Sequence, residues 1–371
     1  MRAIGIILAG GNNHRMRELS QKRAIAAIPI AGSYRSIDFA LSNMSNSHIQ
    51  KVAVLTQYNA RSLNEHLSSS KWWDFGRKQG GLYIFTPTIT PDNSFWYQGT
   101  ADAIYQNLSF LKSSHEPYVI IASGDCVYKL DYNKVLEYHI AKRADITVVC
   151  TDVSGEDATR FGCVKMNEDS RIVEFDEKPM VTQSTTISTG IYVIRRRQLI
   201  ELIEKCGQED RHDFVKDILI RYKNLKRIYG YKIDTYWSNI STVESYYKTN
   251  MDFLKPEIRD YFFRQYPGVQ SKIDDLPPAK YNPGSDVKNS LISSGCIING
   301  QVENSILFKK VFVGNNCVIK NSIILNDVYL GDNTHIENCV VESRDTIRAN
   351  SYYCGEDGIK VVIEKNERYV L

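Results

Sequence analysis

The sequence predicts an α/β domain with a mostly parallel sheet, followed by a left-handed parallel β-helix. Up to about residue 250, short apolar segments alternate with amphipathic ones, which is the order of strands and helices in a parallel sheet. Beyond residue 285, apolar positions recur at a fixed spacing, as in a solenoid. We therefore expect the α/β domain over residues 1–250, a linker over 251–285 and the β-helix over 286–371.

The first domain is expected to alternate strands with helices. Two amphipathic segments, 102–113 and 130–143, carry apolar residues at helical spacing. Ligands bind such sheets at the carboxyl ends of the strands. The predicted strands are the apolar segments at 3–9, 51–57, 118–125, 144–153 and 190–195.

The segment 251–285 is rich in proline and has no long periodic run, so it predicts a linker with one short helix.

The carboxy-terminal repeat has a period of 17 residues, shown by Cys296, Val313, Leu330 and Ile347. A second apolar position follows six residues after each of the first three, which resembles the hexapeptide β-helix. An antiparallel meander is the alternative, but it gives no reason for asparagine to repeat in register. We expect the stacked asparagines to satisfy backbone groups in the turns. The second apolar positions are Val302, Ile319 and Ile336, and the repeated pairs are Asn304-Ser305, Asn321-Ser322 and Asn338-Cys339.

Composition limits the possible partners. A chain of 371 residues with 43% hydrophobic and 24% charged residues is typical of a globular protein of two domains. The net charge of +3 is spread along the chain, so we expect no nucleic-acid partner. The apolar segment 3–10 is too short to span a membrane and no cleavage site follows it, so we expect a cytoplasmic protein with no membrane partner.

The eight cysteines show neither CxxC spacing nor ligand-like spacing with histidine. Reduced, packed thiols are therefore expected in place of disulfides or a zinc site.

Eight motifs resemble, in order, those of the glucose-1-phosphate adenylyltransferase family, also called the ADP-glucose pyrophosphorylases of bacterial glycogen and plant starch synthesis. They cover nearly the whole chain, and they imply that the first domain is a Rossmann-like nucleotidyltransferase domain. The motifs are LAGG with Arg15, YRSIDFALSNMSNS (34–47), VLTQYNARSLNEHL (54–67), WYQGTADAIYQN (96–107), SGDCVYKLDY (123–132), FDEKP (175–179), STGIYV (188–193) and HDFVKDI (212–218).

The resemblance implies a phosphoryl-transfer chemistry. In this family the phosphate of glucose 1-phosphate attacks the α-phosphate of ATP, and pyrophosphate leaves. A glycine-rich loop with an arginine holds the triphosphate, a lysine adds positive charge, and two aspartates bind Mg²⁺.

Several positions of that machinery are altered in this chain. Asp125 matches the first metal aspartate, but Asn239 stands at the second, so Mg²⁺ binding here is doubtful. Ile25 stands where the family has its active-site lysine. In the loop, Asn13 replaces a glycine, which hinders close approach of the backbone to phosphate. Val215 replaces another family glycine. No catalytic set is therefore intact.

The residues that match ligand-binding positions of the family are better kept. The nucleotide-binding remnant comprises Gly10, Gly11, Arg15, Gln98, Gly99 and Thr100. The sugar-phosphate-binding residues are Glu177, Lys178, Ser188, Thr189 and Gly190. The candidates for binding an anionic effector, such as a sugar phosphate, are Arg35, Arg61, Arg77 and Lys78.

The pattern of losses favours a regulatory subunit of the enzyme, with little activity alone, that pairs with a catalytic homologous subunit in a heterotetramer. A second hypothesis is a competent enzyme in which Lys22 or Arg23 replaces the lysine and Asn239 still binds the metal. A third takes the β-helix as an assembly or acyltransferase domain, although His335 is its one histidine.

Overall fold

The computed structural model describes residues 2–11, 14–76, 80–89, 95–182 and 184–364. The chain divides into two compact units, which are described separately below. Unit 1 comprises Met1–Gly11, Ala40–Ala60 and Leu67–Trp237. Unit 2 comprises Asn12–Phe39, Arg61–His66 and Ser238–Leu371, so it joins an amino-terminal segment to the carboxy-terminal part of the chain.

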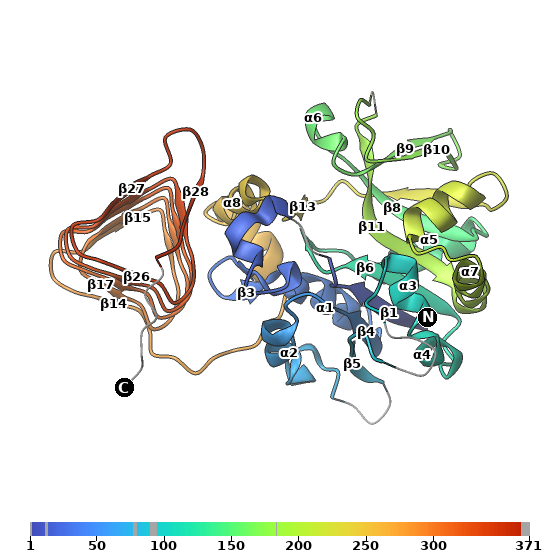
Figure 1. Cartoon of the computed structure of the whole chain (residues 1–371), viewed down its shortest axis with the longest axis horizontal. Helices are drawn as coiled ribbons and strands as arrows, with labels where there is room; N and C mark the ends of the chain where they lie inside the picture. The colour runs from blue at the N-terminus through green and yellow to red at the C-terminus, as the bar shows by residue number, and fades with distance from the viewer. Residues whose placement is uncertain (1, 12–13, 77–79, 90–94, 183, 365–371) are drawn as a thin grey trace. The chain divides into compact units, whose positions relative to one another are not determined.

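Unit 1 is built on a nine-stranded mixed sheet (Figure 1). Its centre is parallel, because β1 pairs in parallel with both β4 and β6, and β4 with β5. β11 runs antiparallel to β6 and β8, and β12 is parallel to β8. The predicted mostly parallel sheet is confirmed. In order, the strands are β10 Ile172–Glu177, β9 Gly162–Met166, β11 Thr186–Arg195, β6 Tyr118–Ser123, β1 Ala3–Leu8, β4 Lys51–Leu55 and β5 Gly81–Phe85, with β8 Ile146–Asp152 and β12 Ile228–Lys232 beside β11.

Helices cover both faces of this sheet. One face packs against α3, α4, α7 and the π-helix η4 around a core that includes Ile146 and Val148. The opposite face packs against α5, since its buried His139 is hydrogen-bonded to Thr147, and neighbouring strand residues point to opposite faces. The helical elements of unit 1 are α1 Ser36–Asn46, which begins in unit 2, η3 Ser70–Trp73, α3 Thr100–Tyr105, α4 Leu108–Lys112, α5 Tyr132–Ala141, α6 Gly155–Ala158, α7 Arg196–Gln208 and η4 Val215–Ile220, whereas α2 Arg61–Leu67 belongs mainly to unit 2. A short strand, β7, covers Cys126–Tyr128.

The helix expected over 102–113 is divided into α3 and α4. Between them, the Asn107 side chain donates hydrogen bonds to the Ala103 carbonyl and to the Tyr97 hydroxyl. A side chain that bonds backbone groups in this way competes with the helical ladder.

Unit 2 ends in the predicted left-handed parallel β-helix, in which three five-stranded parallel sheets form the sides of stacked coils (Figure 1). The first sheet contains β14 Lys280–Tyr281, β17 Ile297–Ile298, β20 Phe312–Val313, β23 Tyr329–Leu330 and β26 Thr346–Ile347. The second contains β15 Asp286–Lys288, β18 Gln301–Glu303, β21 Val318–Lys320, β24 His335–Glu337 and β27 Tyr352–Cys354. The third contains β16 Leu291–Ile292, β19 Ile306–Leu307, β22 Ile323–Ile324, β25 Cys339–Val341 and β28 Lys360–Val362.

The register corrects one member of the predicted apolar column. Val302, Ile319 and Ile336 stack as expected. Val313 and Leu330 also stack, but the residue beneath Val313 is Ile298, not Cys296. The turn between β17 and β18 is two residues shorter than the turn between β20 and β21, so the period there is 15 (313 minus 298).

The role expected for the repeated asparagines holds only in part, since Asn338 Nδ2 donates to the Gly355 carbonyl at 3.4 Å. Asn304, Asn321 and Asn338 have φ of 45°, 45° and 52°, a left-handed conformation that asparagine tolerates. The backbone N–H groups that follow are satisfied by serine hydroxyls: Ser322 N–H donates to Ser305 Oγ at 3.1 Å. Asn304 Oδ1 also accepts from Asn289 Nδ2 of the preceding coil at 2.7 Å, and a longer asparagine ladder occurs at another turn, formed by Asn316, Asn333 and Asn350.

The remainder of unit 2 is short elements, and the first coil begins inside the expected linker, at Lys280. The other elements are η1 His14–Ser20, η2 Ile25–Ala27, β2 Pro29–Ile30, β3 Tyr34–Arg35, β13 Trp237–Asn239, α8 Val243–Asp252, α9 Pro256–Arg259 and η5 Asp260–Arg264.

Candidate functional site

Three adjacent parallel strands of unit 1 end at one edge of the sheet, where ligands of such folds bind. Gly10 follows β1, and Gly124 and Asp125 follow β6, with Gly124 N–H donating to the Leu8 carbonyl at 2.9 Å. Gln57 follows β4, and a Cβ on Gly10 would lie 3.5 Å from the Gln57 side chain. The topology therefore brings the predicted Gly10 and Asp125 to the same edge.

Asp125 is held by its neighbours. It is half-buried, and its Oδ1 accepts hydrogen bonds from Ser123 Oγ and from Cys126 Sγ, the latter at 3.5 Å. Among the described residues, no group of three or more His, Cys, Asp or Glu side chains could hold a metal ion. In unit 2, Asn239 Oδ1 accepts from Ser241 N–H at 3.0 Å, so this amide closes a local turn. At the two positions that match the family's metal aspartates, this chain therefore offers one carboxylate, Asp125, and one neutral amide, Asn239.

The predicted nucleotide loop, Gln98 to Thr100, is fixed at the amino terminus of α3. Asp102 Oδ2 accepts from Gln98 N–H at 2.8 Å and from Gln106 Nε2 at 2.9 Å. Before the loop, Gln57 bonds both backbone groups of Tyr97, through Oε1 at 3.0 Å and Nε2 at 3.2 Å. The loop is thus held from two sides within unit 1.

The sugar-phosphate candidates of β11 lie at an irregularity in that strand. The register with β8 shifts between Ser188 and Tyr192, and Gly190 has φ of +76°, which favours glycine. The Thr189 hydroxyl donates to the Val149 carbonyl at 2.9 Å. A Cβ on Gly190 would lie 3.5 Å from the Ser123 Cβ, so this bulge adjoins the strand that leads to Asp125.

Glu177, at the end of β10, is the half-buried carboxylate of this region. Burial raises the pKa of Glu177, and Lys178, at 3.6 Å, lowers it. The Asp213 carboxylate raises the same pKa further. Lys178 has a left-handed φ of 47°, and its exposed side chain pairs with Glu177.

Unit 2 carries the altered positions of the amino-terminal segment. Ile25 lies in η2 and is 6% exposed, packed as a core residue. Arg15 lies in η1 and is exposed. Gly11 is exposed at the end of the first unit 1 segment, while Asn12 and Asn13 lie outside the described residues.

The proposed substitutes for the lysine are placed differently. Arg23 forms an ion pair with Glu342 and donates to Ser343 Oγ at 3.3 Å, with the two charged side chains 12% and 1% exposed. It is therefore committed to the β-helix within unit 2. Lys22 is exposed. Burial raises the pKa of Asp345 to about 6, and the positive charge of Lys22 partly offsets this rise.

The effector candidates do not form a described cluster. Arg35 donates to the Ser62 carbonyl at 2.8 Å. Burial lowers the pKa of Arg35, and the negative charge of Asp38 offsets part of that shift. Arg61 is 93% exposed and pairs with Glu65 at 3.4 Å. Arg77 and Lys78 lie outside the described residues.

Sequence reasoning missed the residues that position these loops. Gln57 bonds the backbone just before the nucleotide loop, Asp102 bonds the backbone of Gln98, and the His212 carbonyl accepts from backbone N–H groups at the start of α3, just after the loop. A polar residue directly after a buried strand, as Gln57 is, was the available signal. Val215, which replaces a family glycine, begins η4 in helical conformation, so no glycine is required there for backbone conformation.

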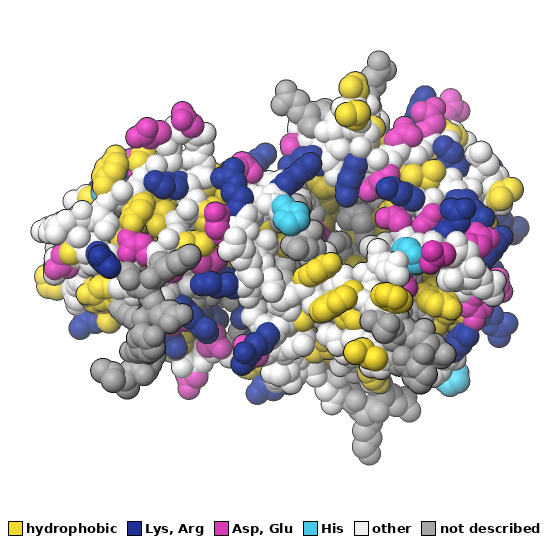
Figure 2. Space-filling model, viewed as in Figure 1, with side chains coloured by type: hydrophobic (Ala, Val, Ile, Leu, Met, Phe, Trp, Pro, Cys, Tyr) yellow, Lys and Arg dark blue, Asp and Glu magenta, His cyan; other side chains and the backbone are white. Residues whose placement is uncertain are grey.

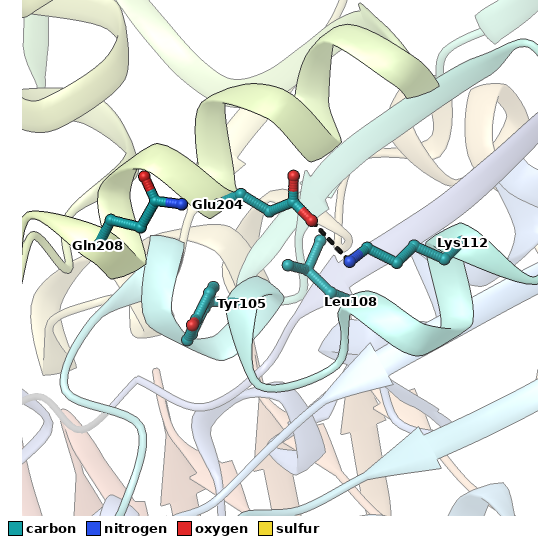
Figure 3. A pocket seen from close by; sticks show the side chains of 5 residues that line it. All are labelled: Tyr105, Leu108, Lys112, Glu204 and Gln208. Carbon is teal, nitrogen blue, oxygen red and sulfur yellow. Dashed lines mark ion pairs between the residues drawn. The ribbon is translucent and has the colours of Figure 1, made fainter. Parts of the chain in front are cut away.

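A surface hollow lies between α3, α4 and α7 (Figure 3). Lys112 and Glu204 form an ion pair across it at 2.6 Å. It is lined by Tyr105, Leu108, Lys112, Glu204 and Gln208, none of which was predicted to bind a ligand.

On the face drawn in Figure 2, basic and acidic side chains are interspersed over each unit, without a continuous area of one sign. In the part of the chain that the structure describes, no helix is long and apolar enough to cross a membrane.

Comparison with known proteins gives two family matches. Residues 4–256 match the nucleotidyl transferase family, and residues 277–360 match the GlmU-like carboxy-terminal hexapeptide family. The chain is 41% identical over 322 residues to the glucose-1-phosphate adenylyltransferase of Thermosipho melanesiensis, covering 85% of this chain and 77% of that protein. It is 40% identical over 319 residues to that of Clostridium novyi, covering 85% and 84%. It is 38% identical over 323 residues to that of Geobacillus stearothermophilus, covering 86% and 83%.

Proposed function

Because the chain belongs to the glucose-1-phosphate adenylyltransferase family of nucleotidyl transferases, we propose that it is a regulatory subunit of that enzyme in glycogen synthesis. The enzyme converts ATP and glucose 1-phosphate to ADP-glucose and pyrophosphate. On this proposal the chain alone has little or no activity, and it acts with a catalytic homologous subunit in a heterotetramer whose response to an anionic effector it alters.

One observation carries the proposal: a buried isoleucine, Ile25, stands at the position of the family's lysine. An aliphatic side chain offers no charge to the phosphates. Each lost electrostatic contact to a transition state typically costs about 3 to 4 kcal/mol, or roughly 100- to 1000-fold in rate. Asn239 adds a second loss, because its neutral amide oxygen closes a turn with Ser241 and cannot replace a carboxylate charge.

The sugar side supports binding without catalysis. Glu177, Lys178 and the β11 bulge at Gly190 retain the residue types that hold a sugar phosphate in relatives. The half-buried Glu177 carboxylate can accept hydrogen bonds from sugar hydroxyls, and the exposed Lys178 amine can pair with a phosphate.

The second hypothesis is a competent enzyme in which Lys22 or Arg23 replaces the missing lysine, and of these two residues Lys22 is the better candidate. Arg23 is engaged by Glu342 and Ser343, so its guanidinium would have to leave a buried ion pair to reach a substrate.

The test is a mixing experiment. A catalytic homologue is assayed for pyrophosphate release with ATP, glucose 1-phosphate and Mg²⁺, alone and after co-expression with this chain, over a range of sugar phosphate concentrations. We expect a co-purifying complex with a changed effector response. If the homologue neither binds this chain nor changes its rate, the regulatory proposal is wrong.

A further inference from the structure

The nucleotide loop of unit 1 is attached to the segment His212–Phe214 by backbone and hydroxyl contacts. The His212 carbonyl accepts from Ala101 N–H at 2.8 Å and from Asp102 N–H at 3.2 Å. The Thr100 hydroxyl accepts from Phe214 N–H at 2.9 Å. Three hydrogen bonds therefore fix the start of α3 to this segment.

Gly99 shows how close the approach is. A Cβ on Gly99 would lie 2.3 Å from the His212 carbonyl oxygen, a distance that no side chain tolerates. The backbone of Gly99 is extended, so glycine is required here for space and not for an unusual conformation. The backbones of the two segments are therefore in direct contact at this point.

The same segment faces the sugar-phosphate residues on its other side. The charge of Asp213 acts on the Glu177 carboxylate. The Phe214 ring packs on the Tyr192 ring, with centroids 5.1 Å apart, and the Tyr192 hydroxyl accepts from Ser188 Oγ at 3.4 Å. His212–Phe214 is thus in contact with the nucleotide loop and with the sugar side at once.

We propose that Thr100 is a positioning residue that couples the two halves of the site: its hydroxyl fixes Phe214, so that ordering of the loop by a nucleoside triphosphate also orders the pocket for a hexose 1-phosphate. The identity of these ligand classes rests on the proposed function. Thr100 acts through Phe214 and Tyr192, and its oxygen accepts the Phe214 N–H.

The physical basis is a shared ordering cost. A first ligand that rigidifies His212–Phe214 reduces the entropy that the second ligand must lose, which gives positive coupling between the two binding events. Removing the Thr100 hydroxyl removes the one hydrogen bond that leads through Phe214 to Tyr192, while the two hydrogen bonds to the His212 carbonyl remain.

The experiment measures this coupling in the full chain by calorimetric titration. Glucose 1-phosphate is titrated with and without saturating α,β-methylene-ATP, an analogue that cannot transfer its adenylyl group. In the wild-type chain we expect the nucleotide analogue to tighten sugar phosphate binding by at least about fivefold. In Thr100→Val the effect is expected to fall within about twofold of none, and Thr100→Ser, which keeps the hydroxyl, is expected to restore it.

Two further variants separate positioning from folding. Thr151→Val removes another threonine hydroxyl that donates to a backbone carbonyl in unit 1, that of Ile233 at 3.3 Å, and is expected to keep the coupling. Gly99→Ala breaks the same attachment as Thr100→Val by a different route and is expected to lose it, which provides a second test if Thr100→Val does not fold.

The outcomes are distinct from those of the proposed function. Coupling that survives in Thr100→Val, or a wild-type chain whose sugar phosphate binding does not respond to the nucleotide analogue, overturns the positioning role. Full turnover by the chain alone would instead refute the regulatory proposal, and the coupling would still be measured in the same titrations.

Discussion

The buried ion pair between Arg23 and Glu342 allows a sharp prediction about the stability of unit 2. Their side chains are 12% and 1% exposed. Glu342 Oε1 also accepts from Ser343 N–H at 2.6 Å, whereas Oε2 is buried with no hydrogen-bond partner in the part of the chain that the structure describes. The Arg23 guanidinium is therefore the charge that compensates this carboxylate.

The perturbation is Arg23→Met, which keeps most of the side-chain volume and removes the charge. It leaves the Glu342 carboxylate buried without its counter-ion, and removing one partner of such a pair typically costs about 3 to 5 kcal/mol. Arg17→Met is the matched control, because Arg17 pairs with Glu244 at 3.5 Å in the same unit but the two side chains are 55% and 61% exposed. An exposed pair is worth at most about 1 kcal/mol.

The assay is native-state hydrogen exchange of the backbone amides in β25, the strand that precedes Glu342. Hydrogen exchange measures the free energy of local opening, so it reports on this part of unit 2 separately from unit 1. We expect this free energy to fall by about 3 to 5 kcal/mol in Arg23→Met and by less than about 1 kcal/mol in Arg17→Met. Equal, small effects in both variants would show that the Arg23 pair is effectively solvated and would refute the reasoning.

Two other predictions concern buried polar groups. Burial lowers the pKa of His139 to about 4, so its imidazole is neutral in the folded chain near neutral pH. In the unfolded chain the same group takes up a proton below about pH 6.5. The free energy of unfolding is therefore expected to fall by at most about 3 kcal/mol as the pH is lowered from 6.5 to 4. The free energy of unfolding measured across that pH range should show this fall, and its dependence on pH should be weaker in His139→Gln. If the variant shows the same pH dependence as the wild-type chain, other groups cause the acid sensitivity. The buried Cys339 N–H donates to Ser322 Oγ at 3.2 Å, so Ser322→Ala removes its acceptor and is expected to lower the free energy of unfolding by about 1 to 3 kcal/mol. Ser351→Ala, at an exposed hydroxyl, should lower it by less than about 0.5 kcal/mol. Equal losses in the two variants would contradict the role given to the stacked serine hydroxyls.

The sequence was most informative where local chemistry repeats. The alternation of strands and helices predicted the parallel centre of the sheet, and the structure places two of the candidate residues, Gly10 and Asp125, at one edge of it. The solenoid period was predicted from the regular coils, but Cys296 was misplaced because one turn lacks two residues, and a fixed period cannot reveal a local deletion.

Contacts between distant residues could not be predicted in the same way. Arg23 and Glu342 are 319 residues apart in sequence, and nothing in either local pattern indicates the other. The attachment of Thr100 to Phe214 has the same character, since one backbone N–H leaves no trace in the residue type at position 214. Family motifs predicted which residues to examine, whereas the hydrogen bonds show which of them hold the backbone in place.

The central claim, that catalytic groups are lost from a retained binding scaffold, is tested most directly by pyrophosphate release from the purified chain alone. The wild-type chain is compared with Ile25→Lys/Asn239→Asp in the presence of ATP, glucose 1-phosphate and Mg²⁺. We expect the wild-type chain to be silent and the double variant to be faster by at least about 100-fold, the gain typical of restoring one electrostatic contact. Turnover by the wild-type chain at an ordinary enzyme rate, about 1 to 1000 per second, would contradict the claim.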